Sequence, residues 1–369
     1  MSEAPGVDTS RTDGLVAAIG GPVHVVGAGL LGTSVGLAAR RAGLEVWLSD
    51  TSPEHVRTAS GLGAGTPAPP TGAAALTVVA VPPDHVAEVV LQALERGGVV
   101  TDVASVKSRP LSDLERRAPE AVARYVGGHP MAGSERSGPL AATAALFDGR
   151  PWAVTPHAGS EPAAVAAVDA LVRICGAEPV RLSPLEHDRA VARTSHLPHL
   201  LAALAAGQLA DAAPEHLSLS GQGVRDVTRI AAGDPALWRQ ILRANQPAVS
   251  EVLREVEASL HRLVGVIETG DDAALGEILG RGVAGTRVIP GKHGGPTLPT
   301  EAVYVAVPDH PGELARLFAD VGEIGVNIED LRIDHDPGRP VGLVELLVAE
   351  DAAPGLREAL GRRDWVTHR

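Results

Sequence analysis

The chain has 369 residues, of which 44% are hydrophobic and 21% are charged, a composition ordinary for a globular protein of two or three domains. Its formal net charge of −13, with no dense run of Lys or Arg, argues against a nucleic-acid partner. The single cysteine, Cys175, excludes an intramolecular disulfide framework and a cysteine-rich metal site, and we expect no metal centre.

The N-terminal segment lacks the apolar core of a signal peptide, because its first 20 residues are polar and contain Gly and Asp. No stretch of the sequence approaches the 18 or so uninterrupted apolar residues of a membrane-spanning helix. We therefore expect a cytoplasmic protein with no membrane partner, in which residues 1–20 form a disordered tail.

A short β-type run at residues 23–26 leads directly into a G-x-G-x-x-G motif, after which the pattern becomes helical. In a dinucleotide-binding fold, Gly27 permits the tight turn, Gly29 lets the backbone approach a pyrophosphate, and Gly32 allows close helix packing. The alternative is a glycine turn that closes a purely structural βαβ unit. The residues expected to meet the cofactor here are Gly27, Gly29, Leu30, Leu31 and Gly32.

An acidic residue follows the next predicted strand. Residues 45–49 form this strand, and it ends at Asp50, about where a carboxylate would bind the adenosine ribose hydroxyls of a dinucleotide. Because a carboxylate at this place repels a 2′-phosphate, the sequence favours NAD over NADP as the cofactor.

The alternation of strand and helix continues, with strands predicted at residues 76–81 and 99–103 and a helix at 84–96. Ser105 follows the fourth strand and lies at the same edge of the sheet as the glycine loop. Its hydroxyl is placed to bind a substrate or to orient a histidine. A helix N-cap is at least as common a role for such a serine, and both roles are compatible.

A histidine among small residues is the main candidate for chemistry. His129 follows a short apolar run and stands in the segment 128–138, where we expect a strand to end and open into a loop. α/β sheets place their chemistry at such strand ends, and a neutral imidazole accepts a proton near pH 7. The alternative is a turn whose histidine only caps or packs.

A sheet-based domain over residues 21–182 is completed by a strand at 152–156, a helix at 162–176 and a strand at 179–182. From residue 183 to 286 the periodicity is helical, which predicts a second domain without strands. A capping box supports this boundary, because Ser183 is followed three residues later by Glu186.

The first helix of the second domain carries two candidate histidines, His196 and His199, on either side of Pro198. Pro198 removes a backbone hydrogen bond and is expected to bend the helix, which can expose a polar group to a ligand. A histidine on a helix is otherwise a solvated surface residue or a satisfied core residue. Two of them beside a bend, in a domain that follows a dinucleotide fold, favour a site.

Two arginines, Arg225 and Arg229, lie four residues apart on a short predicted helix. They share one helical face, and such a pair makes a bidentate clamp for carboxylates. Surface salt bridges to acidic neighbours are the alternative. A long amphipathic helix predicted at 246–264 makes this domain elongated, and we expect it to dimerise.

The rest of the chain is interpreted as a linker and a third domain. Residues 287–300 are rich in Pro and Gly, as linkers often are. Residues 301–369 carry the order βαββαβ, which is ferredoxin-like. The predicted elements are strand 303–307, helix 312–324, strands 328–333 and 343–349, helix 354–362 and strand 365–367.

Three motifs, in this order along the chain, resemble those of the prephenate/arogenate dehydrogenase family of tyrosine biosynthesis. They are the segment 127–138, the segment 195–199 and the segment 226–231. The resemblance runs from about Val23 to Val283 and implies a Rossmann-type domain followed by a helical dimerisation domain. The C-terminal unit resembles an ACT domain, a module that often binds amino acids, through the motif residues Asp309, Gly312, Asn327 and Ile328.

The resemblance implies a role for each site residue. It makes His129 the catalytic base that takes the proton of the substrate's ring hydroxyl, with Ser105 assisting it. His199 lines the same catalytic pocket, Arg229 holds the ring carboxylate, and Arg225 contacts the side-chain carboxylate. The further substrate-binding residues are Ser134, Glu135 on a gating loop, and His196.

The implied reaction is the NAD-dependent oxidative decarboxylation of prephenate to 4-hydroxyphenylpyruvate, with tyrosine acting as effector through the ACT domain. Arogenate is the alternative substrate. A β-hydroxyacid dehydrogenase would need a catalytic lysine in the helical domain, whereas the two lysines, Lys107 and Lys292, lie outside it. A non-catalytic sensor of NAD and amino acids is a further alternative, against which the intact His129, Ser105 and Arg229 weigh.

Overall fold

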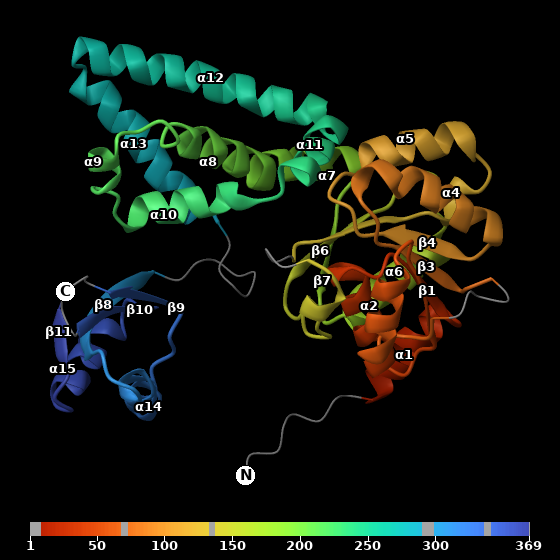
Figure 1. Ribbon diagram of the computed structural model, residues 1–369, viewed down its shortest axis with the longest axis horizontal. Coiled ribbons are helices and arrows are strands. Elements are labelled where there is room, and N and C mark those ends of the chain that lie inside the picture. The colour runs from red at the N-terminus through yellow and green to blue at the C-terminus, as the bar shows by residue number, and fades with distance from the viewer. Residues whose placement is uncertain (1–8, 68–72, 133–136, 290–298, 336–340, 369) are drawn as a thin grey trace. The chain divides into compact units, whose positions relative to one another are not determined.

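The computed structural model of the protein describes residues 9–67, 73–132, 137–289, 299–335 and 341–368. They form two compact units, one that runs to Arg262 and one that begins at Leu263 (Figure 1). Within the described residues, no helix is both long and apolar enough to cross a membrane.

A four-stranded parallel sheet lies at the centre of the first unit, with the strand order β2-β1-β3-β4. The strands are β1 (Val23–Val26), β2 (Val46–Ser49), β3 (Leu76–Val79) and β4 (Val99–Asp102). Strand β2 lies on one side of β1, and β3, the next strand in the chain, lies on the other side of β1. The crevice outside the carboxyl ends of β1 and β3 is therefore the place where a doubly wound sheet binds its ligand.

Helices cover both faces of this sheet and divide its core in two. Residues of α2 (Leu30–Arg41) and α6 (Pro162–Ile174) share one apolar cluster with β1 and β2. Residues of α4 (Val86–Arg96) and α5 (Ser108–Arg117) share another with β3 and β4. This double cover explains why β3 reads as a continuous apolar run and is buried along its whole length. The helix α3 (Pro53–Gly61) follows β2.

The prediction of a disordered tail over residues 1–20 is wrong for its second half. Residues Thr9–Ile19 form helix α1, which packs against α6 (Figure 1). Leu15, Val16 and Ile19 of this helix pack in the core that α2 and α6 share. The polar character of the segment hid this amphipathic face, whose partner lies some 150 residues further along the chain.

A second, three-stranded sheet holds the His129 segment. Its order is β5-β6-β7, with β5 (Gly127–Pro130) antiparallel to β6 (Pro151–Thr155) and β7 (Glu178–Arg181) parallel to β6. The Val126 amide donates to the Val100 carbonyl oxygen at 3.0 Å, so this sheet begins beside β4. His129 therefore lies inside a strand, one residue before its end, and not in the loop that we expected after residue 126.

The helical part of the first unit begins with the predicted capping box, because Ser183 Oγ accepts from the Glu186 amide at 3.2 Å. Helix α7 (Pro184–Val191) passes into a π-helical turn at Ala192–His196 and then into α8 (Leu197–Gly207). The expected bend at Pro198 takes this form, with Pro198 in the first turn of α8, where its missing N–H is tolerated. The helices that follow are α9 (Pro214–Leu217), α10 (Gln222–Arg229), α11 (Pro235–Ala244) and α12 (Gln246–Thr269).

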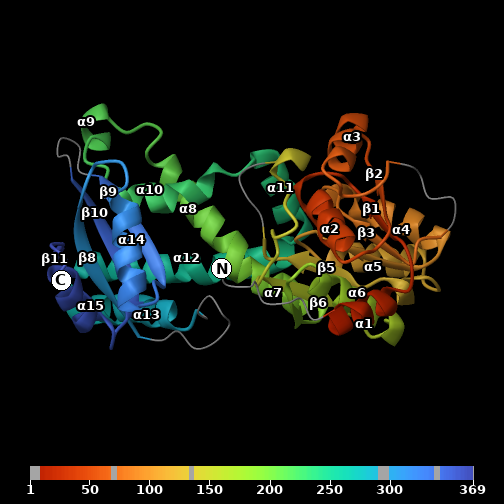
Figure 2. The ribbon, with the colours of Figure 1, turned by 90° about the horizontal axis from the view of Figure 1, so that it is seen from below.

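The second unit contains α13 (Asp272–Arg287) and the predicted βαββαβ order, which is confirmed. Its antiparallel sheet has the order β11-β8-β10-β9, and α14 and α15 pack against β8 (Figure 2). The bounds are β8 (Thr300–Pro308), α14 (Glu313–Ile324), β9 (Asp330–His335), β10 (Val341–Ala349), α15 (Ala353–Gly361) and β11 (Val366–His368). Of the linker expected at 287–300, residues 290–298 lie outside the described residues.

Candidate active site

The glycine loop after β1 has the geometry of a tight turn against β3. Gly27 has φ +105°, and a Cβ added to it would lie 2.1 Å from the Ala80 carbonyl oxygen. A Cβ on Gly32 would lie 1.9 Å from the Gly27 carbonyl oxygen, so helix α2 approaches the loop too closely for any larger residue. Gly29 caps α2 and has open space beside it. The loop thus offers backbone N–H groups and room for an anion.

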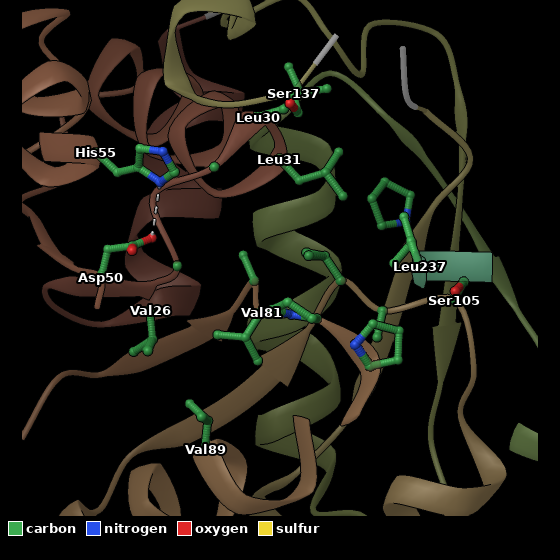
Figure 3. Close-up of a pocket in the computed structure, with 18 of the residues that line it drawn as sticks. Val26, Leu30, Leu31, Asp50, His55, Val81, Val89, Ser105, Ser137 and Leu237 are labelled. Atoms are coloured by element: carbon green, nitrogen blue, oxygen red, sulfur yellow. Dashed lines mark ion pairs between the residues drawn. The ribbon is translucent and has the colours of Figure 1, made fainter. Parts of the chain in front are cut away.

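Asp50 stands where β2 ends, next to the glycine loop. Its carboxylate accepts hydrogen bonds from the Ala28 amide at 2.6 Å and the Ser52 amide at 2.7 Å. His55 Nδ1 lies 3.9 Å from Asp50 Oδ2 (Figure 3). The carboxylate thereby keeps a fixed position at the edge of the pocket, with its remaining lone pairs available to a ligand.

A cavity of about 790 Å³ extends from this loop to His129. Its volume lies in the usual range for small-molecule and cofactor sites. Figure 3 shows Asp50 and His55 on one side of it and Ser105 and Leu237 on the other. The predicted site residues that line it are Gly27, Gly29, Leu30, Leu31, Asp50, Ser105 and His129, while Gly32 packs behind the loop.

The imidazole of His129 is held from behind by a second histidine. Its Nδ1 lies 2.9 Å from Nε2 of His187, and His187 Nδ1 lies 2.9 Å from Oδ1 of Asp188. His187 and Asp188 are both buried on α7. Burial lowers the pKa of His129 well below its usual value, and electrostatic interactions with His187, Lys107 and His196 lower it further. His129 is therefore neutral near pH 7.

A buried ion pair fixes the strand that carries His129. Lys107 Nζ donates to Asp102 Oδ1 and to the carbonyl oxygen of Gly128, the latter at 2.6 Å. The Tyr125 hydroxyl donates to Asp102 Oδ2 at 2.7 Å. Lys107 and Asp102 have side chains exposed by 1% and 0%. Because Gly128 precedes His129, this cluster ties β5 to the end of β4.

Ser105 lies on the cavity wall and is not the N-cap of α5, since Lys107 occupies that position. The backbone amides of Lys107 and Ser108, at the start of α5, donate instead to the carboxylate of Asp188 at 2.8 Å each. The capping role that we considered for Ser105 thus belongs to a residue of another helix. The role of Ser105 toward a substrate stays a prediction.

The two histidines around Pro198 gather with Trp238 of α11. The His199 ring stacks on Trp238 with a centroid distance of 3.6 Å, and His196 meets the same indole edge-on at 6.0 Å. His196 Nδ1 lies 3.3 Å from Asn245 Nδ2, which also donates to the Asp188 carbonyl oxygen. Burial lowers the pKa of His196 to about 4 and also lowers that of His199. Both are neutral side chains of a polar cluster beside the cavity.

Arg225 and Arg229 are exposed on α10 and do not line the cavity. Ile230, the residue after Arg229, accepts a hydrogen bond from His199 Nδ1 at 2.9 Å, which joins the end of α10 to the histidine cluster. Ser134 and Glu135 lie outside the described residues. In the second unit, Asp309, Gly312, Asn327 and Ile328 lie around α14, as described below.

Sequence reasoning missed the residues behind His129. Two features of the sequence could have indicated them. Asp102 stands at the end of a predicted strand, and His187 and Asp188 are adjacent in a helix that begins with a capping box. Nothing local indicated that Lys107 and Asp188, 81 residues apart, would meet. The contact depends on how α7 packs against α5, which is a property of the tertiary structure.

Comparisons with known proteins agree with this arrangement. Residues 35–181 match the family profile described as prephenate dehydrogenase, nucleotide-binding domain. Residues 183–281 match the profile described as prephenate dehydrogenase, dimerization domain. Together the two profiles cover most of the first unit and continue to residue 281.

Relatives and solved structures extend the match to most of the chain. The chain is 40% identical to a probable prephenate dehydrogenase, NovF, of Streptomyces niveus, over 92% of this chain and 98% of that protein. It is 30% identical to the prephenate dehydrogenase of Bacillus subtilis, over 84% and 87% of the two chains. The prephenate dehydrogenase structure from Aquifex aeolicus, solved with hydroxyphenyl propionate and NAD+, is 27% identical with a TM-score of 0.65, over 73% of this chain and 98% of that one. The chain belongs to the prephenate dehydrogenase family.

Proposed function

We propose that the protein catalyses the NAD-dependent oxidative decarboxylation of prephenate to 4-hydroxyphenylpyruvate. The observation that carries this proposal is the position of His129 in the wall of the cavity that begins at the glycine loop. A base in this position would contact a substrate that is bound beside the reactive end of a dinucleotide. The relative from Aquifex aeolicus, solved with NAD+ and a hydroxyphenyl compound, supports the same pair of ligand classes.

The described residues of the cavity fit NAD. The open space at Gly29 and the start of α2 suit a pyrophosphate, which a helix N-terminus attracts. The carboxylate of Asp50 suits ribose hydroxyls and disfavours a 2′-phosphate. When bound there, NAD+ would accept a hydride from the ring carbon that bears the substrate's hydroxyl group.

Replacing Asp50 with alanine is expected to weaken NAD binding relative to NADP binding. A hydrogen bond to a charged group contributes about 1.5–3 kcal/mol, so we expect a loss of roughly ten- to hundred-fold in NAD affinity. Fluorescence titration with each cofactor measures the ratio of the NAD affinity to the NADP affinity. Glu45→Ala, at the other end of β2, is the matched control. An unchanged ratio would show that another residue contacts the ribose.

The part of His129 in this reaction is to move one proton. It takes the proton of the ring hydroxyl while that carbon is oxidised to a ketone. The ring carboxylate then leaves as CO2, and its bonding electrons pass through the ring to the same oxygen, which takes the proton back from His129. The ring becomes aromatic, so the net reaction is strongly downhill. Positioned proton transfer accelerates a step by about 10²–10⁴-fold.

We propose that Arg229 and Arg225 hold the two carboxylates of prephenate, with Ser134, Glu135, His196 and His199 completing the substrate site. The hydrogen bond from His199 to Ile230 supports this proposal, because it joins the arginine helix to the histidine cluster. Guanidinium groups bind carboxylates in a bidentate geometry that a lysine does not reproduce.

Arg229→Ala is expected to raise the KM for prephenate by roughly ten- to hundred-fold, with a smaller effect on kcat, because a charge-assisted hydrogen bond is lost. Steady-state kinetics at saturating NAD measure both constants. Arg193→Ala removes an exposed arginine that pairs with Glu255, and it serves as the control for charge. An unchanged KM would contradict the clamp.

We also propose that the domains divide at the predicted boundaries, with 183–286 as the helical domain, 301–369 as the C-terminal domain and helix α1 joined to the sheet domain expected at 21–182, and that the helical domain forms a homodimer. Large apolar side chains exposed on and around α8 and α10 support a partner surface, since monomers rarely expose such a group. They are Leu201, Leu204, Leu217, Leu219, Val224, Val227 and Ile230.

We propose that the C-terminal unit is an ACT domain that binds tyrosine. Gly312, with φ +96°, begins α14, and Asn327 follows the other end of that helix. Twelve helical residues span about 18 Å, so the motif of Asp309 and Gly312 and the motif of Asn327 and Ile328 are well separated in one chain. Two copies of the domain would bring the two motifs together around one effector.

The test is NADH formation, followed by absorbance, with prephenate and with arogenate separately, each with and without tyrosine. Turnover of prephenate with NAD and its suppression by tyrosine are the expected results. Turnover of arogenate alone would change the substrate, and turnover without any effect of tyrosine would remove the effector proposal. Binding of NAD with turnover of neither compound would favour the non-catalytic sensor.

A further inference from the structure

His129 is the first of three polar side chains that form a line leading away from the cavity. His187 follows it at 2.9 Å, and Asp188 follows His187 at 2.9 Å. His187 is 1% exposed and Asp188 is 3% exposed, whereas His129 is half-buried and reaches the cavity wall. The line thus connects a group that can touch a ligand with a carboxylate that cannot.

The carboxylate at the buried end is held in its charged form. Burial alone would raise the pKa of Asp188, but hydrogen bonds from His187, Ser108 and Lys107 lower it below its usual value. The bonds from the Lys107 and Ser108 amides are 2.8 Å long and come from groups that can only donate. Asp188 therefore acts only as an acceptor.

This acceptor decides where the protons lie on both imidazoles. Because Asp188 Oδ1 accepts from His187 Nδ1, the neutral His187 carries its proton there and has a lone pair on Nε2. His129 Nδ1 must then donate to that lone pair. The other nitrogen of His129, Nε2, is left without a proton, which is the state that a base requires.

Burial opposes a proton that stays on His129, and the ammonium group of Lys107, which lies behind the strand, acts in the same direction. Asp188 is the carboxylate at the end of the line, and it adjoins His187 rather than His129. The carboxylate that can stabilise an imidazolium thus contacts His187 and not His129.

We propose that His187 and Asp188 are positioning residues of His129, which fix its tautomer and hold the transferred proton during the reaction. His129 Nε2 takes the hydroxyl proton, and the proton on His129 Nδ1 passes to His187 Nε2. His187 becomes an imidazolium whose Nδ1–H still donates to Asp188 Oδ1. The reverse transfers return one proton to the product oxygen, so no proton is gained or lost. This inference rests on the proposed function of His129.

The first experiment replaces His187 with glutamine, whose amide oxygen can accept the bond from His129 Nδ1 but binds no proton. We expect kcat to fall by roughly 10²-fold, with little change in KM, because the transferred proton can no longer rest beside Asp188. His157→Gln, a histidine bonded to the Val122 carbonyl on another part of the domain, is the control. An unchanged kcat in the His187 variant would overturn the proposal.

A second variant, Asp188→Asn, tests the charge at the buried end of the line. Its amide oxygen can take the place of Oδ1, which accepts from both His187 Nδ1 and the Lys107 amide, but the amide has no negative charge to stabilise an imidazolium on His187. We expect kcat to fall by roughly 10²-fold with little change in KM. Asp188→Glu, which keeps the charge, should retain more activity than the amide. If the two variants lose the same activity, the charge of the carboxylate is not what Asp188 provides.

Nitrogen NMR of the histidine rings tests the same inference in the unmodified, ligand-free protein. We expect protons on Nδ1 of both His129 and His187 at neutral pH. A proton found on Nε2 of His129 would overturn the proposal, whatever the variants do. This measurement needs no turnover, so a failure of the proposed function, seen as no NADH formed from prephenate, is distinguished from a failure of the relay.

Discussion

Replacing His129 with asparagine is expected to reduce kcat for prephenate by roughly 10²–10⁴-fold, the usual contribution of a positioned general base. Asparagine is close to histidine in size near the backbone and can keep a bond toward His187, so β5 should stay in place. It has no group that takes a proton near pH 7. Because His129 touches only one end of the cavity, the affinity for NAD should stay nearly unchanged.

Two measurements separate this loss from a loss of structure. Titration with NAD in the absence of substrate reports whether the glycine loop is intact, and the pH profile of the residual rate reports whether a base still titrates. A flat residual profile is expected in the variant. If the asparagine variant turns over prephenate at the normal rate, His129 is not the base, and Ser105 or a bound water would have to be considered.

The glycine loop and the alternation of strands and helices along the chain could be predicted from the sequence because they depend on neighbouring residues. Gly27 needs its left-handed backbone, and Gly32 needs the absence of a side chain, for reasons that act within a few residues. The capping box at Ser183 is local in the same way. Such features are visible as spacing, and the structure contains each of them.

The support behind His129 could not be predicted in this manner. His187 was visible as one of several histidines on a helix, yet its contact with His129 spans 58 residues. Helix α1 was missed for a related reason, since its few apolar residues form a buried face only by packing against α6, which is distant in the sequence. The strand of His129 also follows the apolar run of residues 125–126, where we expected a loop, because pairing with β6 rather than apolar composition sets its bounds.

The buried pair of Lys107 and Asp102 allows the largest effect on stability to be expected. Lys107→Met keeps much of the volume of the side chain but leaves the Asp102 carboxylate buried without its cation. Breaking one partner of a buried pair costs about 3–5 kcal/mol in the free energy of unfolding. Urea denaturation measures this loss, and it should be accompanied by weaker activity, since Lys107 also holds the Gly128 carbonyl next to His129.

The double variant Lys107→Met with Asp102→Asn distinguishes charge from packing. Removing the carboxylate's charge relieves the uncompensated group, while the amide oxygen can still accept from the Tyr125 hydroxyl. The double variant should therefore be more stable than Lys107→Met alone, because replacing both partners of a buried pair costs less than removing one. Equal losses in the two variants would mean that Lys107 acts through its bond to Gly128 and not through Asp102. In that case the lysine would serve to position β5, and the activity of His129 would fall in step with the loss of stability.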